Sequence, residues 1–299
     1  MLAAAAALAL AGCGRSDPLP VAHGGGGPRF TVVAGEDFWG SIAAQLGGPR
    51  VSVRSVVADP GVDPHSYQPS AADARAFADA NMAIVNGLGY DPWARQLLSA
   101  SPSPRRVVLD VGATLGLRGG ANPHRWYFPG DVRRVIAAIV EGYDRIDPAG
   151  AGLFAARRRA FETHALARYD ALRREVRARY AGAPVGYSEG IFQGLGEDLG
   201  LRLLTPPGFV KAVTEGTDVT AGDTAAVEAQ VRERRIAVWV FNSQNATPDV
   251  ARVTALARKR GIPVVEITET LSPRGASFEG WQVAQLQQLL SALGRARGG

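Results

Sequence analysis

The chain has 299 residues, of which 46% are hydrophobic and 20% charged, and its formal net charge is +5. This composition excludes a disordered chain, and the length allows two domains with separate cores. Lys211 and Lys259 are the only lysines, so the positive charge is almost entirely arginine, distributed along predicted helices. No aromatic-interleaved basic groove or nucleic-acid motif accompanies these arginines, and we predict no nucleic-acid partner. Cys13 is the only cysteine, which excludes an intrachain disulfide and a cysteine metal cluster.

The N-terminal segment is typical of a secreted, lipid-anchored protein. Residues 1–12 form an apolar run of small residues, which predicts a signal peptide. The run is shorter than the ~20 apolar residues that span a bilayer. It ends in a Leu-Ala-Gly-Cys sequence that resembles a bacterial lipobox, which implies lipidation of Cys13. No Lys or Arg precedes the run, which leaves open whether the natural start lies further upstream. Residues 13–28, rich in Gly and Pro, predict a lipid anchor and flexible tether.

Two further regions each predict an α/β lobe. In residues 29–146, short apolar strands alternate with amphipathic helices, and the same alternation returns in residues 183–299. This alternation favours a mainly parallel sheet flanked by helices in each lobe. The lobes share an architecture but do not appear as sequence repeats.

Residues 147–182 predict one long, rigid helix that joins the lobes. Asp147 is a suitable N-cap, Pro148 stands at the first helical position, and Gly182 and Pro184 end the pattern. The apolar positions recur at helical spacing: Phe154, Phe161, Ala165, Tyr169, Leu172, Val176 and Tyr180. Such a helix would be about 50 Å long.

Two of the four histidines share a context that predicts a binding site. His65 and His124 each follow a proline, in the sequences DPH and NPH, and each lies in a loop between a strand and a helix. In open α/β sheets, ligands bind beyond the carboxyl ends of the strands, so both imidazoles can reach one crevice. His23 lies in the tether, and we expect His164 to lie on the surface of the linking helix.

The second lobe provides carboxylates in corresponding places. Glu189 ends one predicted strand and Glu269 ends another. Glu266 lies three residues before Glu269, so strand alternation puts it on the opposite face, and we prefer Glu269. Two imidazoles and two carboxylates form a ligand set for a divalent metal, and bidentate carboxylates would permit five or six coordination.

Four segments resemble the motifs of the metal-specific solute-binding lipoproteins of bacterial ABC importers, the zinc and manganese class. They are GVDPHSYQPS, NPHRWYFP, YSEGIFQ and ITETLSP, and the resemblance covers nearly the whole chain. It implies capture of one divalent metal ion, no catalysed reaction, delivery to a membrane permease, a monomer and small lobe movements. By motif position it implies the ligands His65, His124, Glu189 and Glu269.

Two departures from the family pattern bear on the metal. The fourth ligand is more usually Asp than Glu, and zinc-specialised members often have His where this chain has Glu189. A His-rich loop, which some zinc-specialised members carry, is also absent from the sequence. The Glu at position 189 and the absence of a His-rich loop shift the expectation slightly from zinc toward manganese or iron(II). Zinc and manganese both stay open, with iron(II) as a further candidate.

Three other functions can be weighed against this prediction. Residues 186–190 match the G-x-S-x-G nucleophile elbow, but no histidine follows Ser188, so the required order of the triad fails. A surface-anchored, metal-dependent hydrolase would need an open coordination position, and it is the main alternative if only three ligands bind. A surface lipoprotein without a ligand would not need matched Pro-His loops.

Overall fold

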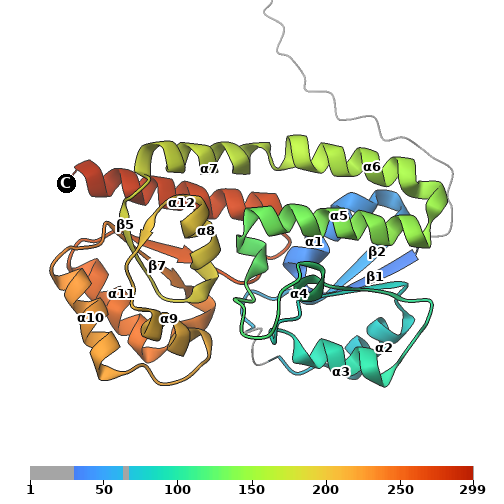
Figure 1. Cartoon of the computed structure of the whole chain (residues 1–299), viewed down its shortest axis with the longest axis horizontal. Helices are drawn as coiled ribbons and strands as arrows, with labels where there is room; N and C mark the ends of the chain where they lie inside the picture. The colour runs from blue at the N-terminus through green and yellow to red at the C-terminus, as the bar shows by residue number, and fades with distance from the viewer. Residues whose placement is uncertain (1–29, 63–66, 299) are drawn as a thin grey trace, which may run out of the picture.

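The computed structural model describes residues 30–62 and 67–298, with side chains described as far as Ala296. It consists of two α/β lobes side by side, crossed by long helices that extend over both (Figure 1). The predicted fold class is confirmed, because each lobe has a four-stranded sheet in which all strand pairs are parallel. The predicted signal segment, Cys13 and the tether lie outside the described residues. Among the described helices, none has the length and apolar character needed to cross a membrane.

The first lobe has the strand order β2-β1-β3-β4. Its strands are β1 (Phe30–Glu36), β2 (Val51–Val57), β3 (Met82–Val85) and β4 (Val107–Asp110). Its helices are α1 (Asp37–Gly47), α2 (Ala71–Asp79), α3 (Pro92–Ala100), α4 (Val111–Thr114) and α5 (Pro129–Ile146), with the 3₁₀ turns η1 (Gly48–Arg50) and η3 (Arg125–Tyr127). Alternate residues of β1 enter different cores: Val32 packs in the cluster with α1 and α5, and Val33 in the cluster with α2 and α3. The central strand is therefore apolar on both faces.

The second lobe repeats this topology with the order β6-β5-β7-β8. Its strands are β5 (Pro184–Tyr187), β6 (Arg202–Leu203), β7 (Val238–Asn242) and β8 (Val264–Ile267). Its helices are α8 (Gln193–Asp198), α9 (Pro207–Thr214), α10 (Ala221–Arg232), α11 (Pro248–Lys259) and α12 (Phe278–Gly298), with the 3₁₀ turns η6 (Gly190–Phe192) and η7 (Ser243–Asn245). Trp239 of β7 faces α9, α10 and α11, whereas Val240 faces the core shared with α12.

The linking helix is present but is not one uninterrupted α-helix. After the 3₁₀ turn η4 (Pro148–Gly150) come α6 (Ala151–Ala160), the π-helical turn η5 (Phe161–Ala165) and α7 (Ala167–Tyr180). The Leu166 N–H donates to the Phe161 carbonyl, a bond across five residues. Both side chains are buried, and a π turn places residues five apart on one face. The predicted stripe had used Ala165 in place of Leu166.

The expected N-cap of this helix also differs. The Asp147 carboxylate makes no side-chain capping bond to the helix start. Instead it receives two hydrogen bonds from the Arg50 guanidinium, which lowers its pKa. The start of the linking helix is thereby fastened to the first lobe at η1.

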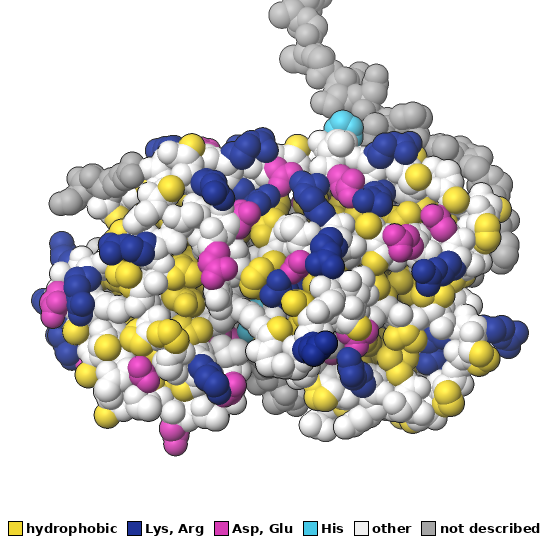
Figure 2. All heavy atoms as spheres, viewed as in Figure 1, with side chains coloured by type: hydrophobic (Ala, Val, Ile, Leu, Met, Phe, Trp, Pro, Cys, Tyr) yellow, Lys and Arg dark blue, Asp and Glu magenta, His cyan; other side chains and the backbone are white. Residues whose placement is uncertain are grey.

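Charge on the linking helices is balanced locally. Figure 2 shows Lys and Arg side chains scattered over both lobes on the face in view, interspersed with Asp and Glu. Several linking-helix arginines form ion pairs with nearby carboxylates, among them Arg158 with Glu162 and Arg173 with Asp198. This is the solvated helical face that the sequence predicts.

Candidate metal site

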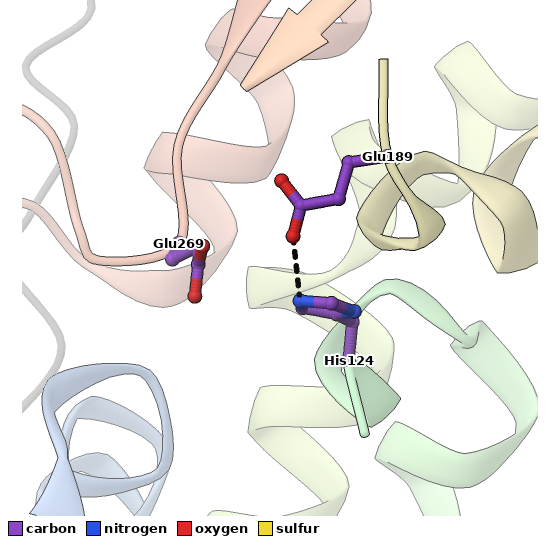
Figure 3. Close-up of side chains that lie close together, drawn as sticks. All are labelled: His124, Glu189 and Glu269. Atoms are coloured by element: carbon purple, nitrogen blue, oxygen red, sulfur yellow. Dashed lines mark ion pairs between the residues drawn. The ribbon is translucent and has the colours of Figure 1, made fainter. Parts of the chain in front are cut away.

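Three of the four predicted ligands meet at the junction between the lobes. His124 lies directly before η3, Glu189 follows β5, and Glu269 follows β8. All three are 0% exposed, and one potential ligand atom of each lies within 4.8 Å of those of the other two. His124 Nε2 is 3.4 Å from Glu189 Oε1, and the Glu269 carboxylate faces this pair from the opposite side (Figure 3). One imidazole from the first lobe and two carboxylates from the second thus surround one point.

The other sequence candidates fall elsewhere. His65, the fourth predicted ligand, lies outside the described residues, as does His23. Glu266 is exposed, which agrees with the preference for Glu269, although Glu269 itself stands in the loop beyond β8. His164 is exposed on the linking helix, as predicted.

Asn122 orients the imidazole. Its Oδ1 accepts a hydrogen bond from the backbone N–H of His124 (3.0 Å), so this atom is an acceptor. His124 Nδ1 lies 2.9 Å from the same oxygen and must therefore be the protonated ring nitrogen. In the neutral imidazole the lone pair is then on Nε2, the atom that faces Glu189. Asn122 Nδ2 also donates to the Gly190 carbonyl (2.7 Å), which connects the imidazole loop to the other lobe.

Two neutral donors hold the carboxylates. Nδ2 of Asn242, a buried residue that ends β7, donates to Glu189 Oε2 (2.9 Å) and to Glu269 Oε1 (2.7 Å). The Tyr90 hydroxyl donates to Glu269 Oε2 (2.5 Å). These bonds provide hydrogen-bond partners for oxygens of two buried carboxyl groups that lie close together.

The loop that carries Glu269 is fastened through its backbone. Gln244 Oε1 accepts from the N–H groups of Glu269 (2.6 Å) and Thr270 (3.0 Å). Its Nε2 donates to the Pro60 carbonyl (3.0 Å) of the first lobe. The N–H of Leu271 donates to the Asp37 carboxylate at the start of α1 (3.1 Å). These two hydrogen bonds to the first lobe hold the Glu269 loop in position relative to His124.

Burial controls the ionisation of groups around the site. Burial and the nearby charge of Glu269 raise the pKa of the Tyr90 hydroxyl well above its usual value, so Tyr90 stays a neutral donor. Burial raises the pKa of Asp37 to about 7 and that of Asp91 to about 6. Burial, with the charge of Asp91 nearby, raises the pKa of Glu36 well above its usual value. The carboxyl groups of Asp37, Asp91 and Glu36 therefore stay protonated to higher pH than exposed carboxyl groups do.

The sequence prediction missed several polar residues around the ligands. Asn242 and Gln244 were not singled out, and Asn122 was part of the NPH motif without a role. Their position at the carboxyl end of a buried strand or beside a Pro-His pair was the available signal. Ser188, next to Glu189, also contributes, because its buried hydroxyl accepts the Asn242 N–H (3.1 Å).

The fold and this cluster define a class: two-lobed proteins that enclose a ligand between parallel α/β lobes. The family model described as the periplasmic component A of the zinc-uptake complex matches residues 32–292. The chain belongs to this family, which confirms the resemblance seen in its motifs.

Individual relatives are similar over parts of their length. The chain is 29% identical over 160 residues to the manganese-binding lipoprotein MntA of Halalkalibacterium halodurans, a match that covers 52% of this chain and 51% of that protein. It is 25% identical over 261 residues to the iron-binding protein YfeA of Yersinia pestis, covering 83% and 72%. The chain therefore spans about half the length of the first of these relatives.

A solved structure supports the fold. The manganese-bound periplasmic metal-binding protein of Candidatus Liberibacter asiaticus superposes with a TM-score of 0.73 at 18% identity, covering 89% of this chain and 100% of that one. At this identity, the likeness concerns the arrangement of the two lobes rather than the ligands.

Proposed function

We propose that this protein captures one divalent transition-metal ion between its lobes and delivers it to the permease of an ABC importer. The observation that carries the proposal is the convergence of His124 Nε2 with the carboxylates of Glu189 and Glu269 in a fully buried cluster. A buried charge is costly unless it is paired, hydrogen-bonded or bound to a metal. A divalent cation would neutralise both carboxylates at once.

The donor atoms suit a transition metal. Imidazole nitrogen binds zinc, manganese and iron, and carboxylate oxygen adds charge neutralisation. His65 would be the fourth ligand by its motif, from the first lobe. Relatives named as manganese-binding and iron-binding proteins, and the zinc-uptake description of the family, support this group of ions.

The proposed location is outside the cytoplasm. Cleavage before Cys13 and lipidation of its thiol would anchor the protein to the membrane, with residues 13–28 as tether, and the protein would act there as a monomer. The matched family, described as a component of a zinc-uptake complex, supports a transport role rather than the alternative of a metal-dependent hydrolase. No catalysed step is part of the proposal.

Thermal unfolding of metal-stripped protein tests the proposal. A ligand at 100 times its dissociation constant stabilises the folded state by about 2.7 kcal/mol, which appears as a higher midpoint. We expect zinc, manganese or iron(II), but not magnesium, to raise the midpoint of the wild type. We expect no such shift in His124→Ala and a normal shift in His164→Ala, the exposed control. A wild type that responds to none of the transition metals would overturn the proposal.

A further inference from the structure

Asn242 occupies a central place between the two carboxylates. It is the last residue of β7 and is 0% exposed. Its Oδ1 accepts the backbone N–H of Gln244 (3.0 Å), which fixes the orientation of the amide, because the other amide atom must then be the donor nitrogen. The two N–H groups of Nδ2 go to Glu189 Oε2 and Glu269 Oε1. The buried Asn242 amide thus donates one hydrogen bond to each of the two proposed ligands.

This arrangement leaves the two oxygens of Glu189 in different environments, whereas both oxygens of Glu269 accept hydrogen bonds. In Glu189, Oε2 is bonded to Asn242 while Oε1 faces His124 Nε2 at 3.4 Å. In Glu269, Oε1 is bonded to Asn242 and Oε2 to the Tyr90 hydroxyl. A carboxylate that binds an ion through both oxygens must rotate until both oxygens point at the ion. A hydrogen bond from the Asn242 amide to one oxygen opposes that rotation.

We propose that Asn242 is a positioning residue that limits Glu189 to one metal–oxygen bond, and that the site thereby favours zinc over manganese. The inference rests on the proposed function and concerns the choice of ion at the same site. Zinc takes four ligands in most protein sites, whereas manganese suits octahedral coordination rich in oxygen. One oxygen from Glu189 suits the smaller coordination number. Releasing its second oxygen would suit the larger one.

The test compares Asn242→Ala with the wild type. We expect zinc affinity to fall by about 10- to 100-fold, the usual effect of losing a hydrogen bond to a ligand, and manganese affinity to fall less. The ratio of the two affinities, measured by competition with a chromophoric chelator, should therefore decrease. Asn245 lies three residues further along the chain than Asn242, and Asn245→Ala is the matched control, because the Asn245 amide donates to the Val213 carbonyl rather than to a proposed ligand. It should leave the ratio unchanged.

Cobalt(II) provides a spectroscopic measure that a merely structural role would not change. Four-coordinate cobalt absorbs visible light strongly and six-coordinate cobalt weakly. We expect a strong band in the wild type and in Asn245→Ala, and a weaker band in Asn242→Ala. The variant Asn242→Leu keeps the side-chain volume without the donors and should give the same result if the alanine variant fails to fold.

The outcomes separate the two proposals. A wild type that binds neither zinc, manganese nor cobalt overturns the proposed function. A wild type that binds them but gives a weak, six-coordinate cobalt spectrum overturns the inference about Asn242 alone. If Asn242→Ala and Asn242→Leu lose zinc affinity and manganese affinity equally, with an unchanged cobalt band, Asn242 has a structural role and the inference about Asn242 is overturned.

Discussion

The amide of Asn122 shows how one side chain can prepare an imidazole for a metal. Its Oδ1 lies 2.9 Å from His124 Nδ1 and accepts a hydrogen bond from it, so that Nε2 faces the two carboxylates. Because its other amide atom binds the Gly190 carbonyl next to Glu189, it also relates the ligands of the two lobes.

We therefore expect Asn122→Ala to lower metal affinity by about 10- to 100-fold, because the ring loses its fixed tautomer and orientation. Isothermal titration with the metal that binds the wild type most tightly would measure this. Asn81→Ala is the control, since Asn81 accepts the Thr31 N–H at the sheet, far along the chain from the ligands. An affinity equal to that of the wild type in Asn122→Ala would contradict the assigned role.

The individual ligands were more predictable than the residues that support them. The proposed ligands His124, Glu189 and Glu269 could be singled out because each belongs to a motif in a loop that follows a strand. Asn242 and Gln244 belong to no periodic pattern, and their importance comes from contacts with residues such as Pro60 that are far away in sequence. A single sequence holds no direct record of such contacts.

At the scale of elements, the sequence predicted where the linking helix lies better than how continuous it is. The N-cap of α10 is Thr220, whose hydroxyl accepts the Asp223 N–H (3.1 Å). Strand β6 is only two residues long. The π turn was missed because a helical stripe can use Ala165 or Leu166 equally well until the packing of both lobes decides between them.

The capping choice gives a prediction with an internal control. Thr220→Ala should lower the free energy of unfolding by about 1 kcal/mol, the usual cost of losing an N-cap side chain. Asp218→Ala should change it little, because Asp218 is exposed and does not cap the helix. Chemical denaturation of the two variants would measure both effects. Equal destabilisation by the two substitutions would rule out this assignment of the cap.

At the scale of the whole molecule, the lobes share one apolar core. The largest cluster of buried side chains includes residues of both sheets, the linking helices and α12. Hydrogen bonds across the junction reinforce it, including the bond from the Tyr127 hydroxyl to the Thr268 carbonyl (2.8 Å). A continuous core favours the small lobe movements that the family resemblance implies over a wide hinge.

The stability of the metal-free molecule should depend on pH through its buried acids. Asp37, whose pKa rises from an ordinary value of 3.8 to about 7, binds more protons in the folded chain than in the unfolded chain. Its contribution to stability is therefore lost as pH rises from about 4 to about 7. Asp37→Asn removes this loss while keeping an acceptor for the Leu271 N–H.

We expect the unfolding midpoint of Asp37→Asn, relative to the wild type, to increase between about pH 4 and about pH 7 and to level off above that range. Thermal unfolding of metal-free protein at several pH values would measure it, with the exposed Asp218→Asn as control. A difference between Asp37→Asn and wild type that is constant with pH would show that Asp37 does not titrate in this range.

The π-helical turn at Phe161–Ala165 has a consequence for how the site is aligned. Successive residues of an α-helix are rotated by about 100° around its axis, so the wider turn sets the rotational phase between α6 and α7. Helix α6 packs on the first lobe and α7 on the second, which carries both Glu189 and Glu269. Deleting one residue from the π turn would restore a regular helix but rotate the second lobe relative to the first, and both carboxylates would move away from His124. The number of residues in the linking helix is thus as much a determinant of the proposed metal site as the proposed ligands themselves.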